Sequence, residues 1–466
     1  MLQASIDDTE IEPGHIYEWR LVATRMRGGD GPSPARRVTG YNQVKHFTVA
    51  QHAHEADEDI PTYVATTFEL PGAVDLGALE SALLHFVRRH EVLRCIYRPL
   101  AGDLSGDPLG PDEVALKLVD VGRAGTADEV RAYLHEFFQG VDPLSWPLIV
   151  MGAVVRETSA TVHFSWDHLV TDGLSNPLAV RDIATAYAAY ARGEEPELPE
   201  AGSYLDFGRE ERQLNRTLSL EDGRLDHWKG FMARSGGFFP RFPLELGTEP
   251  GLFYPSVHET DALLTDAGTD ALEARCREAG GKLFMGLLAA VGVSIRAEGG
   301  PDVYRALMPT NERGRGTYAH SVGWFINTMP VEFSVAEEED FPRVLGNARE
   351  AIALQRRHSD VHFVKAWRLL APAEYASMRY WPHAVNFFSY SDFRRSPGAE
   401  HHASWQPRLH VWLARHNGIC LWLHRNDTGL HLNAAYVDTP QARRTKAGLV
   451  RRLTRTMENV VSSGAF

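Results

Sequence analysis

The spacing of apolar residues predicts alternating strands and helices in the first half of the chain. Thr62–Leu70 is rich in β-branched and aromatic residues, which is typical of a strand. Leu76–His90 instead carries apolar residues at helical spacing, and Asp75 before it is a suitable N-cap. By the same tests we expect helices at Ala127–Gln139 and 176–192, and strands at Leu93–Tyr97, Leu148–Val155 and Thr161–Trp166.

Two segments of the first half show neither the helical spacing nor the alternation of a strand. The stretch Glu18–Glu58 is mixed in character and rich in Gly and Pro around Gly28–Pro34, which indicates an exposed loop. Gly193–Gly202 is charged, contains two prolines and has no periodicity, so we interpret it as a surface connection.

The second half returns to the same alternation. We expect helices at Asp266–Ala279, Lys282–Ala297 and Gln441–Val461, and strands at Asp302–Leu307, Ile419–Leu423 and Leu430–Tyr436. A chain of 466 residues exceeds the roughly 250–300 residues at which one hydrophobic core stops growing. We therefore predict two α/β lobes, residues 1–200 and 201–466, with the boundary in the surface connection.

Composition narrows the classes of function. The chain has 48 Lys and Arg against 61 Asp and Glu, which argues against a general nucleic-acid binder because phosphate contacts need clustered basic residues. No run of about 18 apolar residues is present, so we expect no membrane span. The cysteines Cys95, Cys276 and Cys420 are widely spaced, and the first residues lack the basic and apolar character of a signal peptide. We therefore expect a cytoplasmic protein.

The most informative stretch for chemistry is Trp166–Gly173, where a predicted strand runs into a tight turn. Asp172 follows His168 by four residues, from where a carboxylate can orient an imidazole or form an ion pair that fixes the turn. Gly173 permits a positive φ or a close approach of substrate. Because the ordinary pKa of histidine is about 6.5, His168 is a candidate general base. A histidine after a strand is more often structural, so the spacing alone leaves both interpretations open.

This turn resembles the HHxxxDG motif of the condensation domains of nonribosomal peptide synthetases and their acyltransferase relatives. His168 matches the second histidine, Asp172 the aspartate and Gly173 the glycine, whereas Asp167 stands where the family has its first histidine. Catalysis in this family is assigned to the second histidine. The departure at Asp167 therefore bears on the packing of the loop more than on the chemistry.

Other segments resemble motifs of the same family in the same order. Arg89–Arg94 resembles the RHExLR motif, Tyr204–Phe207 the YxDF motif, and His227–Lys229 the pair that follows it. Pro309–Arg313, after its helix and strand, matches the PxxxR unit, and Val322–Thr328 resembles the GxFxNT motif. The resemblance extends from about residue 60 to the C-terminus.

The resemblance implies a fold of two lobes, each similar to chloramphenicol acetyltransferase, which meet in a V around a central tunnel. It implies that His168 lies in the tunnel, with donor and acceptor entering from opposite sides. It also implies that Asp172 is structural and pairs with Arg313. Trp324 and Asn327 are expected either to support the tunnel or simply to pack in the core.

A finer likeness concerns Tyr187, which follows Asp172 after fourteen intervening residues. This pattern is similar to that of the polyketide-associated acyltransferases, which esterify hydroxyls of complex lipids and trehalose glycolipids. Free-standing condensation enzymes that acylate natural products are similar too. We therefore expect Tyr187 to line the tunnel, and the acceptor to be a hydroxyl of a natural product or glycolipid.

The resemblance also implies the donor. We expect the acyl group to arrive as the thioester of an acyl or peptidyl carrier protein in trans, or as acyl-CoA. Phosphopantetheine or coenzyme A is then part of the donor substrate, and no other cofactor is expected. Two alternatives remain: amide formation on an amine acceptor, and a non-catalytic module that docks carrier proteins. The presence of both His168 and Asp172 favours activity over the silent module.

Other catalytic classes lack their motifs in this chain. The sequence contains no GxSxG nucleophile turn, no P-loop and no GxGxxG after a strand. His401 and His402 are adjacent, but no further ligands accompany them at the spacing of a zinc site, so we expect no metal.

Overall fold

The computed structural model describes residues 1–24, 37–58, 62–100, 102–314, 316–377 and 383–466, which form two compact units. The first unit consists of Met1–Leu214, Asn311–Ile326 and Phe393–Trp412, and the second of Asn215–Thr310, Asn327–Asp392 and Leu413–Phe466. Composition places the lobe boundary near residue 200, whereas the first unit runs to Leu214 and includes two short later segments. The predicted loop around Gly28–Pro34 lies outside the described residues.

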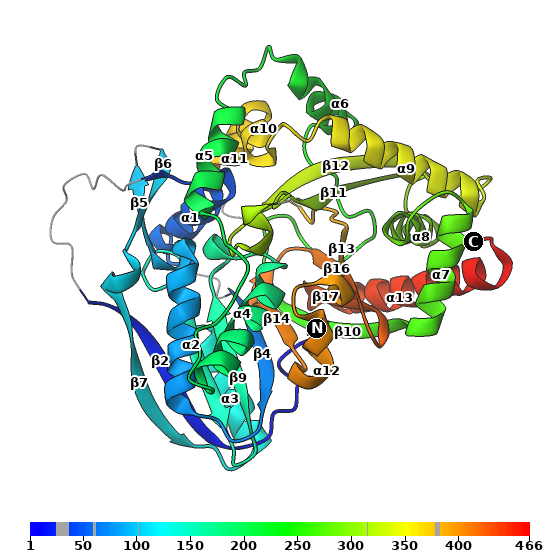
Figure 1. The fold of residues 1–466 in the computed structure, drawn as a ribbon. Helices are drawn as coiled ribbons and strands as arrows, with labels where there is room; N and C mark the ends of the chain where they lie inside the picture. Colours follow the sequence, from blue (N-terminus) through cyan, green and yellow to red (C-terminus); the bar gives the residue numbers. More distant parts are fainter. Residues whose placement is uncertain (25–36, 59–61, 101, 315, 378–382) are drawn as a thin grey trace. The chain divides into compact units, whose positions relative to one another are not determined.

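The first unit is built on a seven-stranded sheet with the order β1-β14-β4-β9-β8-β2-β7 (Figure 1). Its strands are β1 (Leu2–Gln3), β2 (His15–Ala23), β4 (Thr62–Pro71), β7 (Val114–Arg123), β8 (Ile149–Val155), β9 (Ser159–Trp166) and β14 (Arg408–Leu413). Within this sheet, the four neighbouring pairs β4–β9, β9–β8, β8–β2 and β2–β7 are antiparallel. The edge strand β1 pairs parallel with β14. A smaller sheet has the strands β3 (Arg37–Val38), β5 (Cys95–Leu100) and β6 (Asp103–Pro108).

The central strands of the large sheet are buried on both faces because helices cover both sides of it. Val162, Phe164 and Trp166 of β9 join the core beneath α2 (Leu76–Arg89) and α4 (Ser175–Tyr190), which lie side by side (Figure 1). On the other face, the hydroxyl of Ser165 donates to the backbone carbonyl of Phe138 in α3 (Ala127–Phe138) at 2.8 Å. The alternation predicted for this strand is therefore confirmed.

The helix α1 (Tyr41–Glu55) is an element that the apolar pattern did not reveal. Its buried side chains include the polar residues Gln43 and Lys45, so no simple apolar stripe marks the helix. Gln43 is satisfied by donating from Nε2 to the backbone carbonyl of Leu169 at 2.8 Å and to the hydroxyl of Tyr97 at 2.9 Å. The mixed stretch Glu18–Glu58, to which the sequence pattern assigned no helix or strand, contains the end of β2 and the whole of α1.

The second unit is built on a five-stranded sheet with the order β13-β16-β17-β10-β15. Its strands are β10 (Tyr254–Thr265), β13 (Ser389–Asp392), β15 (Arg415–His416), β16 (Ile419–Asn426) and β17 (Gly429–Val437), and β11 (Val303–Asn311) pairs separately with β12 (Ile326–Ser334). The predicted strands around the turn Asn426–Gly429 are confirmed as the antiparallel pair β16 and β17.

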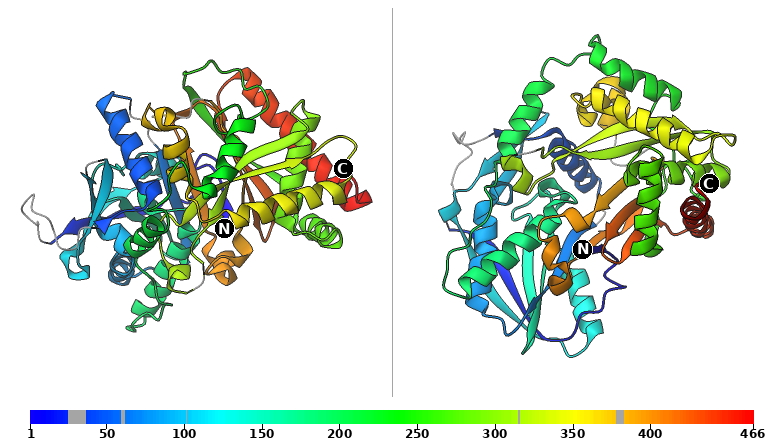
Figure 2. Two further views of the ribbon diagram at one scale, coloured as in Figure 1. Left: turned by 90° about the horizontal axis from the view of Figure 1, so that it is seen from above. Right: turned by 45° about the vertical axis from the view of Figure 1, so that its right-hand side comes forward.

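Four long helices supply most of the core of the second unit. They are α7 (Asp266–Glu278), α8 (Leu283–Ala297), α9 (Phe341–Arg357) and α13 (Pro440–Ser463). α8 is apolar along almost its whole length and packs against the other three, while α9 runs beside β11 and β12 (Figure 2). The predicted helices in this half are therefore confirmed. The shorter helices are α5 (Tyr204–Leu214) and α12 (His402–Trp405) in the first unit, and α6 (Asp226–Arg234), α10 (Phe363–Leu370) and α11 (Pro372–Ser377) in the second.

A buried ion pair holds the later segment Asn311–Ile326 within the first unit. Arg313 donates from Nη1 to Oδ2 of Asp172 and from Nη2 to Oδ1, both at 2.7 Å. The two side chains are only 3% and 1% exposed, and charges so deeply buried are stable only when they are paired and hydrogen-bonded. Ser175 completes the arrangement by accepting from Nη2 of Arg313 at 2.9 Å and donating to Oδ1 of Asp172 at 3.0 Å. The pairing that the resemblance implied is present.

The same residues organise the backbone of Val322–Phe325, which we call the strap. The N–H of Phe325 donates to Oδ2 of Asp172 at 2.9 Å. The N–H of Gly323 donates to the hydroxyl oxygen of Ser175 at 3.2 Å. The first contact is made with the buried carboxylate itself, and the second with the hydroxyl that donates to it, so the position of the strap depends on the ion pair.

Residues from the other motif-like segments also hold the strap. The ring Nδ1 of His90 accepts the N–H of Val322 at 3.4 Å, and the hydroxyl of Tyr204 donates to the carbonyl of Trp324 at 3.0 Å. Gly323 is required because a Cβ there would lie 2.3 Å from a ring carbon of Tyr204. These motif residues therefore act on the structure of the strap.

Replacing Asp172 by asparagine (Asp172→Asn) leaves the guanidinium of Arg313 buried without an anionic partner. We expect the free energy of unfolding to fall by about 3–5 kcal/mol, measured by denaturant titration followed by circular dichroism. The control Asp438→Asn removes an exposed pair with Arg443 and should cost less than about 1 kcal/mol. An Asp172→Asn protein as stable as this control would contradict the structural role of the buried pair.

Candidate functional site

The loop that carries the HxxxDG residues begins where β9 ends. Asp167 has an extended backbone and caps the short 3₁₀ helix His168–Val170 by accepting the N–H of Leu169 at 2.7 Å. Asp172 fixes the next turn, because its Oδ1 accepts the N–H of Ser175, the first residue of α4, at 3.0 Å. The strand end, the cap and the helix start together set the direction of the loop histidine.

The side chain of His168 is half-buried and packs on Trp324 of the strap. The ring centroids are 3.9 Å apart, with an angle of 32° between the planes. Nδ1 of His168 is buried near its own backbone carbonyl and makes no hydrogen bond of normal geometry with the described residues. Nε2 is therefore the ring nitrogen left for contact with a substrate, and that contact stays a prediction.

Two effects lower the pKa of His168 below its ordinary value of 6.5. The larger is burial of the ring, and the second is the positive charge of the nearby His46. The carboxylates of Asp167 and Asp172 and the backbone carbonyl of His168 act in the opposite direction without reversing the shift. An imidazole with a lowered pKa is largely uncharged at neutral pH, which is the form that accepts a proton.

His46 of α1 is a residue of this cluster that sequence reasoning missed. Its Nε2 lies 2.9 Å from Oδ1 of Asp167, and its ring centroid lies 6.3 Å from that of His168 and 5.6 Å from that of Trp324. Burial alone would lower the pKa of His46, but the charge of Asp167 and the hydrogen bond to it outweigh burial and raise it. His46 lies in a segment to which no helix or strand was assigned and belongs to no motif, so nothing in the sequence connected it with the candidate base.

Gly173 does not have the special conformation that its place in the motif suggested. Its φ is outside the left-handed region, so of the two possibilities that a glycine permits here, a positive φ is not the one used. A Cβ at this position would meet no atom within 4 Å. The open space beside the backbone is compatible with the approach of a substrate, which stays a prediction.

Two other expected tunnel residues, Tyr187 and Asn327, make hydrogen bonds with groups outside this cluster. The hydroxyl of Tyr187 accepts the N–H of Asp75, the N-cap of α2, at 3.3 Å. Asn327 belongs to the second unit, where it accepts the N–H of Phe363 at 2.9 Å and donates to the carbonyl of Val361 at 3.1 Å. The contacts of both residues are structural, and a role of either in lining a tunnel stays a prediction.

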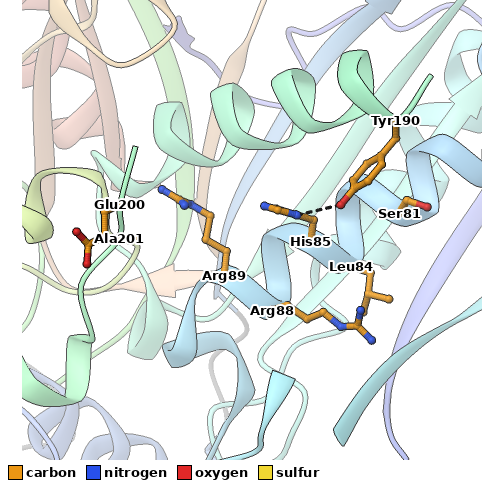
Figure 3. Close-up of a pocket in the computed structure, with 8 residues that line it drawn as sticks. All are labelled: Ser81, Leu84, His85, Arg88, Arg89, Tyr190, Glu200 and Ala201. Carbon is orange, nitrogen blue, oxygen red and sulfur yellow. Dashed lines mark hydrogen bonds between the residues drawn. The ribbon is translucent and has the colours of Figure 1, made fainter. Parts of the chain in front are cut away.

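The first unit also has a hollow of about 570 Å³, and His168 is not among the residues that line it (Figure 3). Arg89 in its wall donates from Nε to a buried carboxylate oxygen of Asp182 at 3.0 Å, and the ring of His85 contacts the hydroxyl of Tyr190 at 3.1 Å (Figure 3). Its lining residues are Ser81, Leu84, His85, Arg88, Arg89, Tyr190, Glu200 and Ala201. None of them belongs to the cluster around His168.

The described residues contain no group of three or more His, Cys, Asp or Glu side chains arranged to hold a metal ion. Among the helices that the structure describes, none is long and apolar enough by itself to cross a membrane. The helices α7 and α8 meet the same criteria of length and composition only as a pair, which is bent by 96°. Neither finding adds a group to the site around His168.

Comparison with known proteins gives relatives that are acyltransferases. Acyltransferase PapA3 of Mycobacterium tuberculosis is 26% identical over 335 residues, which cover 71% of this chain and 70% of PapA3. The trehalose-2-sulfate acyltransferase PapA2 of the same organism is 24% identical over 340 residues, which cover 71% of this chain and 70% of PapA2.

Solved structures show the same fold. The structure of PapA2 acyl transferase covers 99% of this chain and 100% of its own, with a TM-score of 0.87 and 21% identity. The first condensation domain of the calcium-dependent antibiotic synthetase covers 93% and 98%, with a TM-score of 0.70 and 16% identity. The two-lobed α/β fold predicted from the motifs is therefore confirmed.

The family itself is identified by a model that spans most of the chain. The condensation-domain model matches residues 52–418, a range that includes the loop of His168, Arg313 and the strap. The chain therefore belongs to the condensation-domain family, and it is an acyltransferase.

Proposed function

We propose that this protein transfers an acyl group from a thioester donor to a hydroxyl of a natural-product or glycolipid acceptor, with His168 as the general base. The observation that carries the proposal is the half-buried imidazole of His168, whose pKa is lowered by burial. Its ring packs on Trp324, and the Asp172–Arg313 pair fixes both the loop and the strap that bring these rings together.

The residues support a simple sequence of bond changes. Nε2 of His168 takes the proton of the acceptor hydroxyl while the hydroxyl oxygen attacks the thioester carbonyl, and a C–O bond forms. The tetrahedral intermediate then expels the thiolate as the C–S bond breaks, and the proton on His168 passes to sulfur. The products are an ester and a free thiol, and His168 returns to its uncharged form. A positioned base of this kind contributes about 10²–10⁴-fold in rate.

Two arguments favour a hydroxyl acceptor over an amine. The name of the relative PapA2 gives a sulfated trehalose as its acceptor, and trehalose offers hydroxyl groups. An α-amine, with a pKa of about 8, is partly neutral without help, whereas an alcohol needs a base to become a good nucleophile. We propose that the donor is acyl-CoA or the thioester of a carrier protein in trans, so that the pantetheine arm enters as part of the substrate.

Removing the imidazole (His168→Ala) should lower kcat/KM with a hydroxyl acceptor by about 10²–10⁴-fold. The loss with the corresponding amine acceptor should be smaller, because that nucleophile is partly neutral unaided. Steady-state kinetics of the purified variant measure both losses. The control His52→Gln changes another partly buried histidine of the first unit and should keep wild-type kinetics. Wild-type rates for His168→Ala with an alcohol would show that another group is the base.

The pH dependence follows from the lowered pKa of His168. The base is present while His168 is uncharged, so activity should be full above this pKa and should be lost as the pH falls through it. In a profile of kcat/KM against pH, the midpoint of the acid limb should therefore lie below 6.5, the ordinary value for histidine. A midpoint above that value would contradict the assignment of the buried imidazole as the titrating base.

The substrate classes can be separated in one assay. The same acyl group is offered on coenzyme A and on a carrier protein, each with an alcohol and an amine acceptor of matched carbon skeleton, and mass spectrometry identifies the product. We expect ester to form faster than amide with whichever donor is accepted. Amide as the faster product with both donors would contradict the hydroxyl acceptor.

A further inference from the structure

The contact between α1 and the catalytic loop places a second imidazole beside His168. His46 Nε2 and Asp167 Oδ1 are 2.9 Å apart, and the side chains are 25% and 6% exposed. The ring of His46 also lies edge-on to Trp324, the residue on which His168 packs. Four side chains from three separate segments, α1, the loop and the strap, therefore meet at one point.

The charge of Asp167 is the physical reason to assign His46 a role. Asp167 precedes His168 directly, and a carboxylate there favours the protonated form of His168, which cannot act as a base. His46 pairs with that carboxylate and brings a positive charge 6.3 Å, centroid to centroid, from the ring of His168. His46 lowers the pKa of His168 by more than Asp167 raises it.

We propose that His46 is a positioning residue for the acyl transfer: paired with Asp167 as a cation, it keeps the imidazole of His168 in the uncharged form and holds the loop against α1. This inference rests on His168 being the base, as proposed above. His46 belongs to none of the family motifs, and its proposed role is to offset the negative charge of Asp167.

Other charged groups near these rings do not replace His46 in this role. The carboxylate of Asp172 also raises the pKa of His168, but its charge is already paired with that of Arg313. On α5 and β6, which pack against α1, the charged groups Glu211, Arg212 and Asp103 interact with Tyr41 at the start of the helix. Lys45 is buried beside His46 on α1, and it is not among the groups that shift either histidine.

The first test compares pH profiles of kcat/KM for wild type, His46→Gln and His46→Lys. His46→Gln loses the cation, so the acid limb should move to higher pH, with kcat/KM at pH 5.5 lower by about threefold or more and unchanged within about twofold at pH 8. His46→Lys restores a positive charge, so its acid limb should return toward that of wild type. His52→Gln, on the same helix, should leave the profile unchanged. A purely structural role would lower activity equally at all pH values, and that result overturns the proposal.

A second test measures the protonation of the two histidines directly in the wild-type protein. Histidine side-chain signals of the wild-type protein are followed by NMR from pH 4.5 to 8.5, and His46→Gln and His168→Gln spectra assign them. His46 should take up its proton at higher pH than His168, and the reverse order overturns the proposal. If His168→Gln retains activity, the base assignment fails whatever this order is. If His168→Gln is inactive but the order is reversed, only the role of His46 fails.

Discussion

The buried ion pair between Asp172 and Arg313 is the interaction on which the candidate site depends. The two residues are far apart in sequence, and Arg313 lies in a segment that enters the first unit between two stretches of the second. Because neither charge is stable without the other, the pair fixes the point where this segment meets the motif loop. The oxygens of the same carboxylate also take the backbone N–H groups of Ser175 and Phe325. One side chain thus determines the loop, the start of α4 and the strap.

The chemistry of His168 follows from this arrangement. The strap brings Trp324 to within 3.9 Å of the imidazole, centroid to centroid, and the resulting burial is the larger of the two effects that lower its pKa. A histidine on a solvated loop would lack both the packing and the lowered pKa. In the proposed mechanism, the motif aspartate contributes by building the surroundings of the histidine, while its own carboxylate is occupied with Arg313.

The elements and the motif order could be predicted because they depend on local patterns. The alternation in β9, the N-cap at Asp75 and the pairing of Asp172 with Arg313 all left a signal in the sequence, either as periodicity or as a family motif. The helix α1 left none, because its buried face mixes polar and apolar residues whose partners come from distant segments. His46 was missed for the same reason, since its contact with Asp167 is a tertiary one. Gly173 shows the converse, because the motif glycine permits a positive φ that the fold does not use.

The central claim is that an acceptor hydroxyl meets Nε2 of His168. The most direct measurement is a crystal structure of the protein with a hydroxyl acceptor and a non-reactive thioether analogue of the donor. We expect the acceptor oxygen at about 2.6–3.2 Å from Nε2 of His168, the range from which a base can take its proton. An acceptor bound with its reacting hydroxyl out of reach of this nitrogen, beside a different side chain that could act as a base, would contradict the account.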